Sequence, residues 1–300
     1  MCPCCNSTRI RPYTRRQAFD YFSCPRCGAI FIDPRLIEEI DAGKSLVTYD
    51  ETYWANELPA ARERAYGPCL ARAAEVIYYC RVPIHRFLDI GTGPGYFLDA
   101  IERYLPGSPI FYGSEKFPPP NEHRSRSSRY IVGNLGDVAN RFEAGMCMEV
   151  LEHLTPAMVQ ALFSELLAVS IPGSLFLFNS GLAEYVRNED PAYLDPASRG
   201  HIVSYTVEAL TELLRGIPFT IRSIRGKSWA FCAERQPVED PKEDITQRVW
   251  SPLPENIRIL EDAAMGSVLK ILGRESIRAY LSDVSMVPDA RIGRRSRQIR

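Results

Sequence analysis

The sequence predicts an α/β protein whose mostly parallel sheet carries helices on both faces, with a small N-terminal ribbon and a C-terminal helical extension. Three observations lead to this prediction. Short apolar runs alternate with helical patterns between residues 80 and 236, a glycine-rich turn joins the first run to the first helix, and paired cysteines stand near the N-terminus. We therefore divide the chain into four parts: 1–33, the ribbon; 34–79, a connector and helix; 80–236, the α/β domain; and 237–300, a linker, amphipathic helices and a basic tail.

The cysteines of the ribbon form two C-x-x-C pairs, Cys2 with Cys5 and Cys24 with Cys27. Pairs at this separation supply four thiolates to one tetrahedral zinc ion and leave no open position, so we expect the zinc to be structural. About thirty residues cannot bury enough apolar surface to fold unaided, and the metal replaces a core. Two disulfides are the alternative, which we disfavour because no signal peptide precedes the cysteines.

Other residues around these pairs support the same interpretation. Asn6 and Gly28 directly follow the two pairs and are residue types that readily adopt the left-handed turn needed there. The remaining cysteines are expected to be reduced thiols: Cys4, Cys69, Cys80, Cys147 and Cys232. After the ribbon we expect a connector to about residue 60 and then a helix over 61–79, kinked at Gly67-Pro68.

A glycine-rich turn follows the first strand of the α/β domain and reads Asp89-Ile-Gly91-Thr92-Gly93-Pro-Gly95. Glycines let the backbone bend tightly and approach a ligand, and the helix N-terminus beyond them offers unpaired N–H groups. The spacing is G-x-G-x-G, not the dinucleotide pattern G-x-G-x-x-G. Asp89 is badly placed for a pyrophosphate and well placed for a cationic amino-acid moiety. The turn therefore favours S-adenosylmethionine (SAM) over NAD.

Polar residues also follow the next three strands, which we expect at 110–113, 130–132 and 145–148 and which end in Glu115, Asn134-Leu135 and Glu149. The carboxyl ends of parallel strands share one edge of a sheet, where open α/β sheets bind their ligands. Glu115 can bind both ribose hydroxyls of the cofactor. Asn134, or a backbone amide beside it, can pair with the adenine edge.

Two stretches resemble class I SAM-dependent methyltransferases: Phe87-Leu-Asp-Ile-Gly-Thr-Gly-Pro-Gly95 and Cys147-Met-Glu-Val-Leu-Glu-His-Leu154. The second is especially similar to the O-methyltransferases of ubiquinone biosynthesis. The resemblance covers about residues 84–234 and implies a Rossmann-like methyltransferase sheet. Two positions depart from the family pattern, because Glu143 and Asn134 stand where these enzymes usually have Asp.

Methyl transfer from a sulfonium is an in-line displacement, so the protein has to aim a nucleophile at the methyl carbon and take up its proton. His153 is the first candidate base, with Glu152 beside it, and His201 is the second. Glu149, Glu152 and His153 would share one face if a helix begins there. The resemblance implies that this group binds a divalent metal such as magnesium; helix caps and surface ion pairs are the alternative.

The rest of the domain predicts a loop over 118–129, a helix that starts at Thr155-Pro156, and a fifth strand over 175–179. A helix over 207–214 and a strand hairpin over 219–224 and 228–233 follow. The insertion 181–205, which contains His201, is polar and aromatic. The resemblance implies that it builds the acceptor pocket, and a solvated loop is the alternative.

The C-terminal part lies outside the resemblance. Residues 255–281 predict one or two amphipathic helices, with Ala264, Val268 and Ile271 among their apolar positions, that cover the domain or pair with another subunit. The basic tail contains Arg291, Arg294, Arg295, Arg297 and Arg300. A formal net charge of -1 gives no global field for nucleic acid, and no apolar run has the length of a membrane span. We expect a soluble, cytoplasmic protein.

Three functions follow from these features. The first is a SAM-dependent methyltransferase that acts on an oxygen atom of a small-molecule acceptor: a sugar, a lipid-linked glycan intermediate or a phenol. The second is an RNA methyltransferase that uses the ribbon as its RNA reader, which the interleaved arginines and aromatic residues of the ribbon favour. The third is a non-catalytic scaffold with this fold, which the intact Asp89, glycines and Glu115 disfavour.

Overall fold

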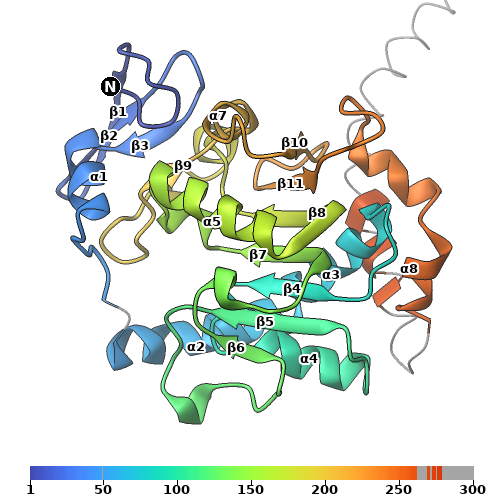
Figure 1. The fold of residues 1–300 in the computed structure, drawn as a ribbon. Coiled ribbons are helices and arrows are strands. Elements are labelled where there is room, and N and C mark those ends of the chain that lie inside the picture. The colour runs from blue at the N-terminus through green and yellow to red at the C-terminus, as the bar shows by residue number, and fades with distance from the viewer. Residues whose placement is uncertain (49, 262–268, 271, 275, 279–300) are drawn as a thin grey trace, which may run out of the picture.

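A seven-stranded sheet forms the centre of the computed structural model, which describes residues 1–48, 50–261, 269–270, 272–274 and 276–278 (Figure 1). The strand order is β10-β11-β8-β7-β4-β5-β6. β11 runs antiparallel to both of its neighbours, and the other adjacent strands are parallel. The predicted fold class is therefore confirmed. The strands are β4 (Phe87–Ile90), β5 (Phe111–Glu115), β6 (Tyr130–Val132), β7 (Phe142–Met148), β8 (Ser170–Asn179), β10 (Phe219–Ser223) and β11 (Ala230–Arg235).

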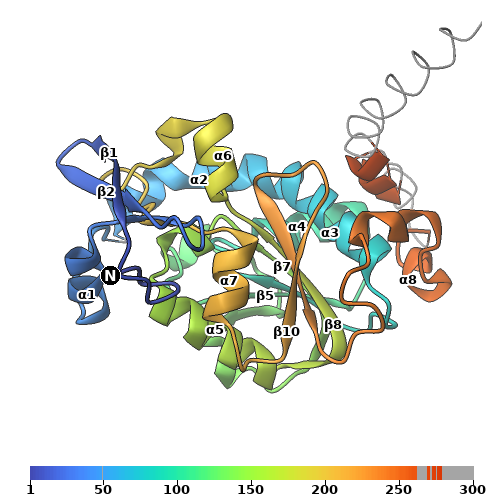
Figure 2. The same cartoon turned by 90° about the horizontal axis from the view of Figure 1, so that it is seen from above.

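Helices cover both faces of this sheet. One face carries α2 (Glu51–Tyr66), α3 (Pro68–Tyr79) and α4 (Tyr96–Tyr104), and the other carries α5 (Pro156–Ala168) and α7 (Val207–Leu213) (Figure 2). Side chains of β8 alternate between the two resulting cores. Leu175 and Leu177 join the core with α3 and α4, while Phe176 and Phe178 join the core with α5 and α7. This alternation explains why a continuous apolar run forms a buried central strand.

The N-terminal ribbon is built into the domain and is not a separate body. Its strands β1 (Arg11–Arg16), β2 (Phe19–Ser23) and β3 (Ile30–Ile32) form a sheet with β9 (Val203–Ser204), in the order β1-β2-β3-β9. β9 comes from the insertion 181–205, whose other elements are α6 (Ala183–Asn188) and the 3-10 turn η4 (Pro191–Tyr193). The ribbon therefore lies directly on the insertion, and α1 (Pro34–Asp41) follows it (Figure 1).

The segment before the α/β domain is more helical than we predicted. The expected connector contains α1 and the first part of α2, and the single kinked helix over 61–79 is two helices separated at Gly67. α2 begins early because the Asp50 side chain accepts a hydrogen bond from Tyr53 N at 2.9 Å and caps the helix. Pro59 is accommodated inside α2. The sequence-based boundary was wrong because we had overlooked this cap.

Other local predictions are confirmed. Residues 118–129 form a loop, with one short turn, η1 (Asn121–His123). α5 starts as expected, with Thr155 Oγ1 accepting from Met158 N at 3.2 Å. β7 begins before the predicted residue, and Glu143 lies inside it. The Glu143 carboxylate accepts from the backbone N–H groups of His85 and Arg86 at 3.0 and 2.7 Å, so it anchors the start of β4.

After β11 the chain forms the turn η5 (Ile245–Trp250) and α8 (Pro254–Arg258). The described residues between 269 and 278 are helical, with Leu269 and Ile277 buried, and a Cβ on Gly273 would lie 2.6 Å from Ala74 Cβ in α3. This part covers the domain. The predicted apolar positions Ala264, Val268 and Ile271, and the basic tail Arg291, Arg294, Arg295, Arg297 and Arg300, lie outside the described residues. Among the described helices, none has both the length and the apolar character needed to cross a bilayer.

Candidate functional site

The glycine-rich turn joins β4 to α4 and forms one wall of a cavity. Asp89 is 3% exposed, and its Oδ2 accepts a hydrogen bond from the Thr92 hydroxyl at 2.6 Å. Burial raises the pKa of Asp89 to about 7. A cationic ligand in the cavity would stabilise the ionised carboxylate. The Asp89 side chain is therefore suited to the ammonium group of an amino-acid moiety.

Two glycines of the turn lie where a side chain has no room. Gly91 has a φ of 68°, and a Cβ on it would lie 2.6 Å from Val150 Cγ2. Gly95 has a φ of 79°, and a Cβ on it would lie 2.6 Å from Tyr130 Cδ2. Residues with side chains rarely adopt this left-handed backbone. The turn therefore needs glycine at both positions, for conformation and for space.

We expect Gly91→Ala to weaken binding of S-adenosylhomocysteine (SAH) by about tenfold or more, because the clash moves the turn against the cavity; backbone strain adds roughly 1–2 kcal/mol. Gly107→Ala is the matched control, since Gly107 also has positive φ but no atom lies within 4 Å of its Cβ position. Calorimetric titration with SAH measures the affinity, and thermal unfolding measures the strain. Equal SAH affinity in both variants would contradict the assigned contact.

Glu115 ends β5 and faces the same turn. Its Oε2 accepts from Gly93 N at 2.8 Å, and its Oε1 accepts from Phe117 N at 2.8 Å. Burial raises the pKa of this carboxyl. Each oxygen of the ionised group keeps a lone pair for a second donor. Glu115 can therefore accept further hydrogen bonds, and its contact with the ribose hydroxyls stays a prediction.

Asn134 and Leu135 follow β6 at the next position along the sheet edge. Asn134 is exposed, and its amide donates to Asp137 Oδ2 at 3.2 Å, whereas Leu135 is buried. Both line the cavity. The contact with adenine stays a prediction.

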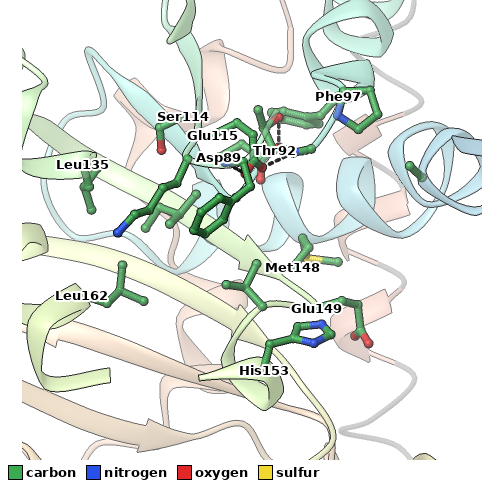
Figure 3. A pocket seen from close by; sticks show the side chains of 18 of the residues that line it. Asp89, Thr92, Phe97, Ser114, Glu115, Leu135, Met148, Glu149, His153 and Leu162 are labelled. Atoms are coloured by element: carbon green, nitrogen blue, oxygen red, sulfur yellow. Dashed lines mark hydrogen bonds between the residues drawn. The ribbon is translucent and has the colours of Figure 1, made fainter. Parts of the chain in front are cut away.

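The cavity has a volume of about 420 Å³. Its walls bring together the predicted residues Asp89, Gly91, Thr92, Gly93, Glu115, Asn134, Leu135, Glu149 and His153. Figure 3 shows Asp89, Thr92 and Glu115 on the side of the cavity opposite Glu149 and His153. Gly95 supports the turn and is not in the wall. No residue of the insertion 181–205 lines the cavity. The prediction that this insertion builds the pocket is therefore not met, because the insertion lies behind Glu149 and His153.

Sequence reasoning missed the residues of α2 that line the cavity, which are Tyr53, Trp54, Glu57, Ala61, Arg64 and Ala65. Trp54 is 6% exposed, and two of its ring atoms lie 3.8 Å from the Cβ position of Gly93. Its indole Nε1 is buried without a hydrogen-bond partner in the protein. Arg64 donates a hydrogen bond to Glu57. The Asp50 cap ahead of Tyr53 and Trp54 was the available signal for this helix.

Two carboxyl groups meet at the cavity wall, which Glu149 lines and Glu152 does not. Glu149 Oε1 accepts from Asn179 Nδ2 at 2.7 Å, and Glu152 Oε1 accepts from the Tyr193 hydroxyl at 2.7 Å. The Tyr193 hydroxyl also lies 3.4 Å from Glu149 Oε2. Burial, and then the neighbouring Glu152, raise the pKa of Glu149 to about 8, and burial raises that of Glu152. This pair favours holding at least one proton at neutral pH.

The arrangement differs from the predicted single helix face. Glu149 has a φ of 53°, Leu151–His153 form the 3-10 turn η3, and α5 starts only at Pro156. The condition that a helix begins at these residues is not met, because Thr155 caps α5, as predicted, and leaves residues 149–153 outside the helix. The side chains of Glu149 and Glu152 nevertheless meet, at the Tyr193 hydroxyl.

Of the two candidate histidines, His153 faces the cavity and His201 lies behind it. His153 lines the cavity, and His201 lies outside its wall with a ring centroid 5.0 Å from that of His153. His201 Nδ1 lies 2.7 Å from Tyr193 O, so it carries the proton and donates it to this carbonyl. Burial lowers the pKa of both imidazoles, that of His201 to about 3. Both rings are therefore neutral at pH 7, the form that can accept a proton.

The magnesium site predicted at Glu149, Glu152 and His153 is not the cluster that the structure assembles. Donor atoms of Glu152, His153 and His201 come within 4.8 Å of one another. Two imidazoles suit transition metals better than magnesium, which prefers oxygen ligands. The donor set does not fit magnesium.

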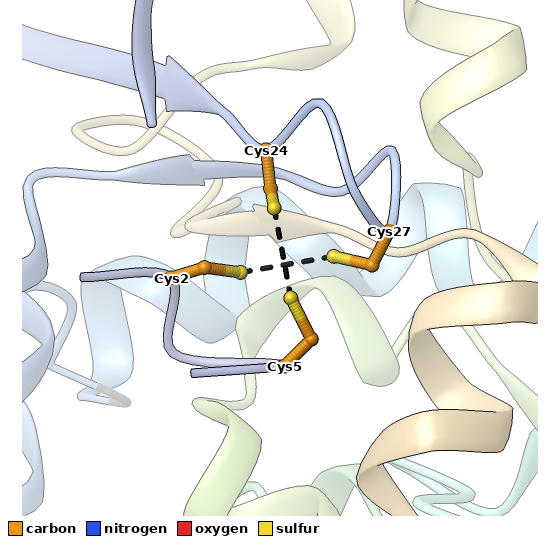
Figure 4. Close-up of side chains that lie close together, drawn as sticks. All are labelled: Cys2, Cys5, Cys24 and Cys27. Atoms are coloured by element: carbon orange, nitrogen blue, oxygen red, sulfur yellow. Dashed lines mark hydrogen bonds between the residues drawn. The ribbon is translucent and has the colours of Figure 1, made fainter. Parts of the chain in front are cut away.

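The four predicted thiolates of the ribbon converge on one point (Figure 4). Sγ atoms of Cys2 and Cys27 are 3.7 Å apart, and those of Cys5 and Cys24 are 3.6 Å apart. A tetrahedron with zinc–sulfur bonds of about 2.3 Å has edges of about 3.8 Å. The residues therefore fit a structural zinc, and the cysteines are free rather than disulfide-bonded. Asn6 and Gly28 have φ angles of 56° and 76°, as predicted for the turns after each pair.

The raised pKa of Asp89 predicts how cofactor binding depends on pH. Below pH 7 the free protein holds a proton on Asp89 that a bound cation displaces, so binding releases this proton. SAH affinity should therefore rise with pH, by up to about tenfold per unit, and level off above about pH 7. Calorimetry at several pH values measures this slope. Asp89→Asn removes the proton that Asp89 releases, and an unchanged slope in this variant would assign the dependence to another group such as Glu149.

Residues 51–224 match the family model described as "Methyltransferase domain". A comparison with curated protein sequences found no match. Among solved structures, a putative O-methyltransferase from Nostoc punctiforme is 16% identical with a TM-score of 0.43, covering 59% of this chain and 60% of that one. Human N-acetylserotonin methyltransferase in complex with SAM is 14% identical with a TM-score of 0.44, covering 67% of this chain and 66% of that one.

A complex of the Haloferax volcanii Trm112 methyltransferase activator with a putative methyltransferase is also similar, with 14% identity, a TM-score of 0.46 and coverage of 64% of this chain and 100% of that one. The chain matches about two thirds or less of the length of the first two proteins. These matches do not single out the ubiquinone-type enzymes. Because the family match spans more than half of the 300 residues, the chain belongs to the methyltransferase-domain family.

Proposed function

We propose that this enzyme transfers the methyl group of SAM to an oxygen atom of a small-molecule acceptor. Sugars, lipid-linked glycan intermediates and phenols are the candidate classes. One observation carries the proposal: the cofactor residues Asp89 and Glu115 share a single cavity with the neutral imidazole of His153. A base beside the methyl donor is what an acceptor hydroxyl needs, because its proton has to leave as the new bond forms.

The roles of the individual residues follow from their places in the cavity. Asp89 binds the ammonium of the methionine moiety, and Glu115 binds the ribose hydroxyls. Arg64 and the indole N–H of Trp54, which has no partner in the protein, are the donors of α2 that we assign to the methionine carboxylate, with Glu57 accepting from the Arg64 guanidinium. His153 accepts the proton of the acceptor, Glu149 forms the polar wall beside it, and the buried Glu152 meets Glu149 at the Tyr193 hydroxyl.

His201 supports His153 and does not touch the acceptor in this proposal. It lies outside the cavity wall, its Nδ1 proton is held by Tyr193 O, and its ring packs against that of His153. None of the nine cysteines is disulfide-bonded, which supports a location in the reducing cytoplasm.

RNA methylation is the alternative that the arginines and aromatic residues of the ribbon suggested. Two of its arginines contact the domain, since Arg16 donates to Pro191 O at 2.8 Å and Arg26 pairs with Glu212, and Arg15 pairs with Asp20 inside the ribbon. The Tyr21 ring, which could have stacked on a base, is 1% exposed. The ribbon thus uses its polar and aromatic side chains to dock on the domain, and this favours a small acceptor.

One assay separates these acceptors. The zinc-loaded protein is incubated with methyl-labelled SAM and a cell extract divided into small-molecule, lipid-glycan and RNA fractions. We expect label in the small-molecule or lipid-glycan fraction, in a methyl ether that resists the mild alkali that hydrolyses carboxyl methyl esters. Label in the RNA fraction alone would overturn the proposal. His153→Ala protein serves as the background for each fraction.

A further inference from the structure

The strand β9 lies between the zinc ribbon and the turn that carries His153. On one edge it pairs antiparallel with β3, and Ile202 O next to it accepts from Ile32 N at 2.9 Å. On the other edge Ile202 N donates to Glu152 O at 2.8 Å. The segment 200–206 is thus hydrogen-bonded to the ribbon on one side and to η3 on the other.

Two buried side chains tie the same segment to the ribbon. The Tyr21 hydroxyl donates to His201 O at 2.6 Å, and Tyr21 is 1% exposed. The Thr206 hydroxyl donates to Cys27 O at 2.6 Å. Cys27 is one of the four thiolate residues. The zinc site is therefore connected to the segment 200–206 by direct hydrogen bonds.

The segment in turn contacts the proposed base from behind. A Cβ on Gly200 would lie 3.1 Å from His153 Nδ1, and the ring centroids of His201 and His153 are 5.0 Å apart. The Tyr205 hydroxyl donates to Leu154 O at 2.8 Å. A shift of the segment would therefore move His153, because close-packed side chains leave no free space between them.

The hydrogen bonds of the cofactor turn involve other partners than the segment 200–206. Asp89 accepts from the Thr92 hydroxyl, and Gly93 accepts from the Tyr130 hydroxyl at 2.7 Å and donates to Glu115. We propose that the zinc-loaded ribbon positions the acceptor half of the site and leaves the cofactor half independent, with Tyr21 as the positioning residue that acts through His201 on His153. This inference rests on the proposed role of His153 as the base.

Tyr21→Phe tests the inference, because it removes one hydroxyl and keeps the buried ring. The matched control is Tyr13→Phe, a second tyrosine of the ribbon that is only partly buried. Amide hydrogen exchange over 150–154 and 200–206 should be about fivefold to tenfold faster in Tyr21→Phe, since one buried hydrogen bond is lost. SAH affinity by calorimetry should stay within about twofold, and Tyr13→Phe should match the wild type in both measurements.

Removal of zinc by a chelator provides a second test of the inference. We expect faster exchange in both segments, retained SAH binding, and recovery of protection when zinc is added back. Once an acceptor has been identified, Tyr21→Phe should lower kcat and leave the KM for SAM unchanged. Unchanged exchange over 150–154 in both the Tyr21→Phe and the zinc-free protein, or an equal loss of SAH affinity, would overturn the inference. Full turnover of His153→Ala would instead refute the proposed base and leave the exchange result standing.

Discussion

His153→Ala should lower the turnover number by about 10²- to 10⁴-fold, the usual contribution of a positioned general base. The imidazole lines the cavity, and burial lowers its pKa, so it is neutral and able to accept a proton at pH 7. The variant should still bind SAH with an affinity within about twofold of the wild type, because the cofactor contacts come from other residues. Initial rates with labelled SAM and calorimetry with SAH measure the two quantities.

His123→Ala is the control for this experiment, since His123 is exposed on η1 and does not line the cavity. It should behave as the wild type. The depressed pKa also fixes the sign of the pH dependence: activity should persist below the pKa of a free imidazole and fall only when His153 becomes protonated. Full turnover in His153→Ala would remove this residue as the base. The carboxyl pair of Glu149 and Glu152 would then be the next candidate.

Asp89→Asn should weaken SAH binding by about 10- to 150-fold at pH 8, because a hydrogen bond between charged groups contributes roughly 1.5–3 kcal/mol. Asparagine has nearly the shape of aspartate and can keep the hydrogen bond with Thr92, so the turn should stay folded. The unfolding temperature should not fall. It can rise at pH 8, because burial of the ionised carboxylate opposes folding above its folded pKa of about 7.

Asp20→Asn makes the same change at an exposed position of the ribbon hairpin and should leave SAH affinity unchanged. Glu115→Gln should also weaken binding, because the ribose hydroxyls lose a charged acceptor. If Asp89→Asn bound SAH as tightly as the wild type, Asp89 would not contact the amino-acid moiety. The raised pKa of Asp89 would then reflect only its place inside the sheet.

The sequence was sufficient to predict that the proposed cofactor residues lie together, because that half of the site is local. Asp89 and the glycines stand within seven residues, and Glu115 ends the next strand along the chain. The turn conformation requires glycine, and parallel strands end at one edge, so spacing alone places these groups together. The four thiolates were predictable for the same reason, since the C-x-x-C spacing already describes each half of the zinc site.

The acceptor half was less predictable because it depends on contacts distant in sequence. Tyr193 joins Glu149 to Glu152, and Tyr21 reaches His201 across 180 residues. Neither contact leaves a periodic signal. The residues of α2 that line the cavity were missed because the helix propensity around Pro59 is low and suggested a connector. The Asp50 cap nevertheless starts α2 ahead of Pro59. The predicted helix face of Glu149, Glu152 and His153 failed because Thr155 caps α5 later in the chain.

Calorimetric titration of the zinc-loaded protein with SAH at pH 8 tests the central claim most directly. The account predicts one SAH bound per chain, with affinity that depends on Asp89 and Glu115, and no binding of NAD under the same conditions. A folded, zinc-loaded protein that does not bind SAH or SAM but does bind NAD or a nucleoside triphosphate would contradict it.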